Sequence, residues 1–326
     1  MNTRNLLKLL AIITSIGAYL MILLGVLVTT TGSGQGCGNT WPFCHGQIIP
    51  GVITIAGIIE YSHRVMASAD GFLVLVLTIC AWLAYRKDFR VKLFAFLSLF
   101  FVILQGALGA LTVVYEGTWE LNWILSVHFG LSLIAFASVL LLTIRLFEVG
   151  KAPQDGPAKA DSGIPRLQLP LWGLAVYTYI VVYTGALVEH TGAVTGCGFN
   201  FPGCGSTYLP SFTSLAGIQV LHRYMAGLLW LFVLGVLVAV VRGYRENRSL
   251  VRGVWWAFIL ITLQAVSGMI NVLTAGQLLA ALLHTTLISI FFSVLCFLCI
   301  QVGWPWRRKK PANIEEKPQL ELKPVS

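Results

Sequence analysis

The sequence predicts an all-α membrane protein in which eight transmembrane helices form two four-helix bundles related by a pseudo-twofold axis. The first observation is composition: of 326 residues, 57% are hydrophobic and 11% are charged. Such a chain is too apolar for a soluble domain and is typical of a polytopic membrane protein. The second is a series of apolar spans, and the third is a set of motifs that occurs once in each half. Lipid cannot hydrogen-bond an open backbone, so we expect each span to cross as a helix.

The spans follow in order along the chain, and each has about the twenty residues that a bilayer-crossing helix needs. No obvious cleavage site follows the first span, so we expect a mature helix and not a signal peptide. The first four spans predict one bundle within 1–147, and the last four a second within 168–306. Residues 148–167 predict a flexible cytoplasmic linker, and the polar residues 307–326 predict a disordered cytoplasmic tail. The approximate spans are 8–30, 61–84, 93–115, 122–147, 168–190, 219–241, 253–274 and 279–302.

The repeated motifs relate the two bundles to each other. A four-helix unit crosses the membrane an even number of times, so both halves have the same orientation and form a parallel repeat. The matched segments are Glu60–Arg64 with Gln219–Arg223 and Gln105–Gly109 with Gln264–Gly268, both shifted by 159 residues, His128 with His284, shifted by 156, and Thr31–Cys44 with Thr191–Cys204, shifted by 160.

The net charge of +9 reflects topology and not a binding site for nucleic acid. Of the 22 Lys and Arg residues, 20 lie at the amino end, in alternate connections or in the tail. The intervening connections, 31–59, 116–121, 191–217 and 275–278, carry neither Lys nor Arg. By the positive-inside rule, we expect both termini in the cytoplasm and the two long loops outside.

Four histidines lie at matched places near the outer ends of apolar spans: His63, His128, His222 and His284. An imidazole inside a membrane is costly unless it has a partner. A single one is most often a hydrogen-bonded packing residue, but four at equivalent positions favour a shared function. Two imidazoles that project inward from opposite helices at similar depth can ligate one iron axially. The sequence therefore predicts two haem sites, His63 with His128 and His222 with His284.

The halves differ beside these histidines. Glu60 lies about one turn before His63, and its counterpart is Gln219. A carboxylate can accept a proton, stabilise a cation or position water, whereas an amide is no base near neutral pH. The difference predicts that the first half performs chemistry and the second carries electrons, unless Glu60 only pairs with Arg64. Asp70, deeper on nearly the same face, is either functional or a buried structural residue.

Four further polar residues have open interpretations. Arg64 and Arg223 each follow a histidine on the outer side, where they either anchor the helices at the interface or pair with an acidic ligand group such as a haem propionate. His45 and His190 lack a histidine counterpart in the other half and border loops. We expect both to be solvated or packed against a loop.

The seven cysteines fall into two groups. Cys80, Cys296 and Cys299 lie within apolar spans and are expected to be packing residues. The other four lie in the two outer loops, on the oxidising side, and favour one disulfide within each loop, Cys37–Cys44 and Cys197–Cys204. A redox role for the first pair is an open alternative. Zinc is disfavoured because the pairs lack a tetrahedral ligand set, although His45 adjoins Cys44.

Over residues 8–302, the chain resembles haem A synthase, in particular the bacterial form with a cysteine pair in each long outer loop. The resemblance rests on Glu60-x-x-His63-Arg64, His128, Leu221-His222-Arg223, His284, the two cysteine loops and the duplication of four helices. It implies a multi-pass protein of the bacterial plasma membrane that oxidises the C8 methyl group of haem O to the formyl group of haem A, with water as the oxygen source, for terminal oxidases.

The resemblance also implies residue roles. His63 and His128 would hold the substrate haem, and His222 and His284 would ligate a permanent haem b. Glu60 would be the essential carboxylate, which stabilises a cationic intermediate or activates water. The expected partners are haem O, haem O synthase, a membrane electron acceptor such as quinone, and the lipid bilayer. The alternatives are a dihaem b-type electron-transfer protein, such as a quinone-linked cytochrome, and a haem transporter.

Overall fold

The structure is a computed structural model that describes residues 3–48, 51, 54–118, 120–149, 164–200, 203–205 and 207–305. The predicted tail and residues 150–163 of the predicted linker lie outside the described residues. All long elements of the described chain are α-helices, and eight of them are long and apolar enough to cross a membrane. The predicted fold class is thereby confirmed. The helices are α1 (Thr3–Thr30), α2 (Ile55–Ala84), α3 (Phe89–Val114), α4 (Glu120–Glu148), α5 (Pro165–His190), α6 (Leu215–Gly243), α7 (Arg248–Leu273) and α8 (Leu278–Val302).

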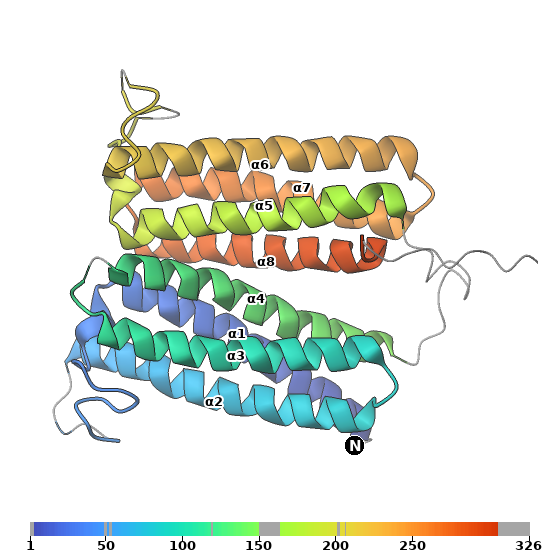
Figure 1. Cartoon of the computed structure of the whole chain (residues 1–326), viewed down its shortest axis with the longest axis horizontal. Helices are drawn as coiled ribbons and strands as arrows, with labels where there is room; N and C mark the ends of the chain where they lie inside the picture. Colours follow the sequence, from blue (N-terminus) through green and yellow to red (C-terminus); the bar gives the residue numbers. More distant parts are fainter. Residues whose placement is uncertain are drawn as a thin grey trace, which may run out of the picture.

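The helices form two groups of four (Figure 1). In the first group, α1 and α3 each pack against both α2 and α4, so α2 and α4 occupy opposite corners of a bundle. In the second group, α5 and α7 each pack against both α6 and α8, which places α6 and α8 on opposite corners. Contacts of α4 with α5 and α8, and of α1 with α8, join the two groups. The helices that carry the predicted ligand pairs are therefore diagonal in each bundle.

Several helices begin before the apolar run that predicted them, because polar side chains cap their first turns. Thr54 accepts a hydrogen bond from the Gly57 N–H at the start of α2, and Ser214 accepts the equivalent bond from Gly217 at the start of α6. Such caps satisfy backbone donors that a helix start leaves unpaired. As a result, Glu60 lies inside α2 and not at its edge. Similarly, α5 begins at Pro165, so the last residues of the predicted linker are helical.

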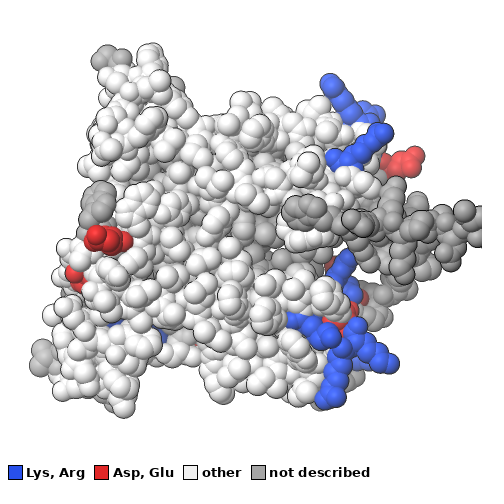
Figure 2. Space-filling model, viewed as in Figure 1, with Lys and Arg blue, Asp and Glu red and all other residues white. Residues whose placement is uncertain are grey.

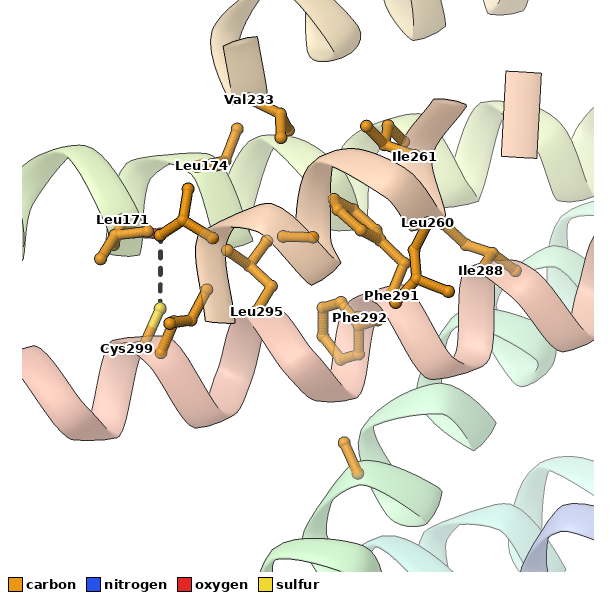
Figure 3. Packing of buried hydrophobic residues seen from close by; sticks show 14 of the residues in the cluster. Leu171, Leu174, Val233, Leu260, Ile261, Ile288, Phe291, Phe292, Leu295 and Cys299 are labelled. Carbon is orange, nitrogen blue, oxygen red and sulfur yellow. Dashed lines mark hydrogen bonds between the residues drawn. The ribbon is translucent and has the colours of Figure 1, made fainter. Parts of the chain in front are cut away.

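The hydrophobic core is divided unequally between the halves. The larger cluster joins all four helices of the second half to α1 and α4. Figure 3 shows its centre, where Leu171 and Leu174 of α5 meet Phe291 and Leu295 of α8. The smaller cluster is confined to the end of the molecule where α1 begins, apart from the predicted sites. The second half therefore contains more of the buried apolar core than the first half does.

Charge is distributed unevenly along the long axis of the helices. Figure 2 shows Lys and Arg gathered at one end of the visible face. That is the end at which α1 begins and at which the connections α2–α3 and α6–α7 lie in Figure 1. The two long cysteine loops lie at the opposite end. The arrangement has the charge asymmetry that the positive-inside rule describes.

Candidate functional site

The four matched histidines form two pairs near the loop end of the bundles. His63 lies on α2 and His128 on α4, and charge on one of these imidazoles would act on the other. His222 on α6 and His284 on α8 are related in the same way. Each pair is thus brought together from diagonal helices, as the spacing of the motifs predicted.

In the second half, neighbouring helices hold both imidazoles by hydrogen bonds. Nδ1 of His222 lies 3.0 Å from Oγ1 of Thr184 on α5. Nδ1 of His284 lies 2.9 Å from Oγ of Ser267 on α7, and its Nε2 lies 3.1 Å from Nε2 of Gln264. The Oε1 atom of Gln264 is buried without a hydrogen bond to any described residue. This oxygen could accept a hydrogen bond from a ligand.

The imidazoles of the second half also lie close to glycines. A Cβ atom added at Gly185 would lie 2.8 Å from Cε1 of His222, and one at Gly268 would lie 3.0 Å from Cε1 of His284. Any side chain at these positions would displace the ring. Glycine therefore permits the close approach of α5 and α7 to the two rings.

In the first half, the imidazoles are held less closely. Nδ1 of His63 and Nδ1 of His128 are buried, and neither atom bonds to any residue whose placement is described. Cβ atoms added at Gly25 and Gly109 would lie 3.6 Å and 3.9 Å from the respective Cε1 atoms, which is ordinary contact distance. Gln105, the counterpart of Gln264, donates to the backbone carbonyl of His128 and not to its ring.

Glu60 is part of a clamp that fixes the first outer loop to α2. Its Oε2 atom accepts a hydrogen bond from the Cys37 N–H at 2.8 Å, and its Oε1 atom pairs with Arg64. Arg64 in turn donates to the loop carbonyls of Thr40 and Phe43. The carboxylate is buried, at 5% exposure. The pairing of Glu60 with Arg64 that the sequence left open is therefore present, together with a loop contact that the sequence did not predict.

The second half repeats this clamp with an amide in place of the carboxylate. Oε1 of Gln219 accepts from the Cys197 N–H at 2.8 Å, and its Nε2 donates to the carbonyl of Val194. Arg223 donates to the loop carbonyls of Asn200 and Gly203. Both arginines thus bind loop backbone, a role that differs from interfacial anchoring and from ligand pairing.

The two loops are closed by disulfides with the predicted pairing, Cys37–Cys44 and Cys197–Cys204. Each loop presses against the start of the next helix. A Cβ atom at Gly36 would collide with the backbone of α2, and one at Gly196 would lie 2.7 Å from the Leu215 carbonyl oxygen. Glycine is required at both places because backbone meets backbone.

His45 and His190 have different environments. His45 is exposed and its Nε2 lies 3.2 Å from the Gly36 carbonyl oxygen, as expected of a loop residue. His190 was expected to be solvated or packed against a loop. Its Nδ1 atom is buried without a hydrogen bond in the described chain, and its charge would act on His128. The neighbouring Glu189 accepts a bond from Thr30 of α1. In the sequence, the only indication of this buried polar site was that Glu189 and His190 stand together at the end of an apolar helix.

Asp70 lies deep between α1 and α2, at 5% exposure. Its Oδ1 atom has no hydrogen-bond partner within the described ranges and occupies the space that a Cβ atom at Gly17 would need. The carboxyl group is thus enclosed against the backbone of α1. Asp70 lies deeper than the histidine pairs near the loops, and its surroundings fit a packing role.

The donor set of each pair fits axial ligation of a haem. No group of three or more His, Cys, Asp and Glu residues suited to a bare metal ion occurs among the residues described. Two neutral imidazoles on diagonal helices, however, are the donors that six-coordinate haem iron requires. The buried Nδ1 atoms of His63 and His128 lack partners among the described residues, and glycines form a close cradle around His222 and His284; both observations fit this donor set.

Comparison with known proteins gives one consistent result. A family described as cytochrome oxidase assembly protein, COX15-CtaA, matches residues 51–296. A protein named "Heme A synthase" from Bacillus mycoides (strain KBAB4) is 40% identical over 301 residues, 92% of this chain and 94% of the relative. "Heme A synthase" of Bacillus cereus (strain G9842) is 40% identical over 296 residues, 90% of this chain and 93% of the relative.

Proposed function

The chain belongs to the COX15-CtaA family of cytochrome oxidase assembly proteins, and from that premise we propose that it is a haem A synthase, an integral membrane oxidoreductase that acts on haem O. The observation that carries the proposal within the structure is the asymmetry of the two clamps. The same loop contact is made by ionisable Glu60 in one half and by neutral Gln219 in the other. Pure electron transfer needs no carboxylate on one side only.

In this proposal the first half is the substrate half. His63 and His128 hold haem O, and the C8 methyl group is oxidised to a formyl group. The overall change adds one water to the methyl group and releases four protons and four electrons, which pass to a membrane acceptor such as a quinone. Glu60, about one turn from His63, stabilises positive charge or positions water beside the methyl group. Such acid–base roles contribute about a hundred- to ten-thousand-fold.

The second half would hold the resident cofactor. His222 and His284 are the proposed ligands of haem b, which supplies one-electron redox capacity when bound, while the protein supplies orientation and electrostatics. The hydrogen bonds from Thr184 and Ser267 to these rings support a permanent site. Arg64 and Arg223 each engage loop carbonyls, so contact with propionates would be an additional role for them.

The exposure of α3 supports a lipid-facing entrance to the substrate half. The buried residues of α3 are Val91, Phe94, Ala95 and Ser98, all near its first turns. The matching helix of the second half, α7, is buried as far as Gln264 and Ser267. The farnesyl tail of haem O could therefore lie in lipid beside the loop end of α3. We place the loops outside and both termini in the cytoplasm of a bacterial plasma membrane, in keeping with the basic end seen in Figure 2.

Pigment analysis of the purified protein tests the proposal directly. One retained haem b together with haem O or haem A supports a synthase, and cells supplied with haem O should accumulate haem A. Two identical b haems and no haem A would instead support the dihaem electron-transfer protein. Uptake of haem by vesicles without its conversion would support a transporter.

A further inference from the structure

The hydroxyl groups of Thr184 and Ser267 have their protons committed to the backbone. Thr184 Oγ1 donates to the Val181 carbonyl at 2.7 Å, and Ser267 Oγ donates to the Gln264 carbonyl at 2.9 Å. A hydroxyl has one proton and two lone pairs. When each hydroxyl donates to that carbonyl, its oxygen meets the histidine as an acceptor, and Nδ1 of His222 and Nδ1 of His284 carry the proton.

This arrangement fixes the tautomer of both rings. With the proton on Nδ1, each Nε2 atom carries the lone pair that can ligate iron. In His284 this lone pair accepts a hydrogen bond from the Gln264 amide at 3.1 Å, so the amide must turn away when iron binds. A hydrogen bond from the other ring nitrogen also fixes ring orientation and raises the basicity of the ligand. We propose that Thr184 and Ser267 are positioning residues that make the second-half histidines a permanent haem site, and that their absence from the first half makes that site exchangeable. This inference rests on the proposed assignment of a resident haem to the second half.

The first half has no hydroxyl at either equivalent position. By the shift of 160 residues that relates the ends of α1 and α5, Thr184 corresponds to Leu24, and by the shift of 159 residues Ser267 corresponds to Leu108. Leu24 is an apolar side chain one residue before Gly25, which adjoins His63, and Leu108 is an apolar side chain one residue before Gly109, which adjoins His128. The rings of the first half are therefore free to adopt either tautomer and to rotate when a ligand enters or leaves.

Burial points in the same direction. Ser267 is 2% exposed and Gln264 is 8% exposed, so water has little access to the bonds that hold His284. Gln105 and Leu108, at the matching places on α3, are only partly buried. A product must leave the substrate half, whereas a cofactor that turns over many times must stay. The hydroxyls lie in the half where retention is needed.

A general packing role for these hydroxyls is the competing explanation, because serine and threonine in apolar helices often bond only to their own backbone. The chain offers matched examples of that behaviour. Thr178 on α5 is buried and donates to Leu174, and Ser293 on α8 is buried and donates to Ser289. Neither contact involves a histidine. Thr178→Val and Ser293→Ala are therefore control variants for Thr184→Val and Ser267→Ala.

The test uses the full-length protein purified with its haem. Apomyoglobin in excess removes haem from the protein, and the release is followed by absorbance. We expect two phases in the wild type, with the slow phase missing in His222→Ala. Loss of such supporting contacts typically weakens metal binding by about 10- to 100-fold. The double variant Thr184→Val/Ser267→Ala should therefore speed the slow phase by about that factor and change the low-spin electron paramagnetic resonance signal of the oxidised haem.

Three results support the inference together: faster release in the double variant, wild-type release in both controls, and wild-type release in Thr184→Ser, which keeps a hydroxyl. Wild-type release and an unchanged spectrum in the double variant would overturn it, as would a single release phase in the wild type. If the double variant does not accumulate, the two single variants are measured in the same way. The assay needs no haem A formation, so the inference and the proposed synthase activity can fail separately.

Discussion

Replacement of Glu60 by glutamine separates the charge of this residue from its structural contact. Gln219 shows that an amide fits the same clamp, because its Oε1 atom accepts from the Cys197 N–H at 2.8 Å just as Glu60 accepts from Cys37. We therefore expect Glu60→Gln to keep the loop in place. The variant loses the negative charge beside Arg64, which retains its bonds to two loop carbonyls.

The expected magnitudes differ enough to distinguish a catalytic from a structural role. A hydrogen bond to a charged group contributes about 1.5–3 kcal/mol to stability and a neutral one about 0.5–1.5 kcal/mol, so the stability cost should be about 1–2 kcal/mol. Loss of an acid–base group should lower the rate of haem A formation by about a hundred- to ten-thousand-fold. That loss corresponds to about 3–5 kcal/mol in the barrier.

The assay is chromatography of haems from cells that express equal amounts of each protein and are supplied with haem O. Glu60→Gln should retain haem b and membrane expression but form little or no haem A. Glu116→Gln is the matched control, because Glu116 also bonds the first loop, through Gln35 at 2.7 Å, but lies outside the clamp. Conversion by Glu60→Gln at the wild-type level would refute a role for the ionised carboxylate and leave the difference from Gln219 unexplained.

Three further predictions concern single features. His222→Ala should lose the stable low-spin haem b spectrum, whereas a normal spectrum with full haem content would contradict the ligand assignment. Mass mapping without reduction should recover Cys37 linked to Cys44, and free, alkylatable thiols at both positions would be the opposing result. Burial alone would raise the pKa of Asp88, but hydrogen bonds from Arg145 and the backbone at the start of α3, with the arginine's charge, hold this pKa below its usual value. Ionised Asp88 therefore stabilises the folded protein fully above the usual pKa of an aspartate, and this stabilisation is lost as the pH falls through the lower pKa of the folded state. Asp88→Asn should flatten the dependence of the melting temperature on pH below about pH 4.

Sequence patterns predicted the features that depend on short-range regularity. Apolar runs located all eight helices, and the repeat placed the histidine pairs on diagonal helices. Helix starts were missed by several residues where a cap such as Thr54 precedes the apolar run. The predicted helix starts at residues 61 and 219 would have left Glu60 outside its helix and Gln219 in the first turn.

Contacts between helices could not be predicted in the same way. Arg64 reaches carbonyls more than 20 residues earlier in the chain, and Thr184 meets a histidine 38 residues later. Such contacts depend on which faces of two helices meet, and the threonine alone is an ordinary residue of an apolar helix. His190 shows the same limit: its position beside a loop left both solvent and packing against the loop open, and only the structure shows that its Nδ1 atom is buried.

The duplication allows a small energetic difference to give the two sites different uses. Two copies of one bundle would bind haem with equal strength, and neither would favour release. A 10- to 100-fold difference in affinity corresponds to only about 1.4–2.7 kcal/mol, which lies within what two supporting hydrogen bonds contribute. The proposed difference between Thr184 and Ser267 in one half and Leu24 and Leu108 in the other would therefore be sufficient to separate retention from exchange. In the proposed assignment Glu60 lies in the half where exchange is easier, so the ionisable carboxylate would occur together with the exchangeable ligand, and the resident haem would have only neutral Gln219 beside it.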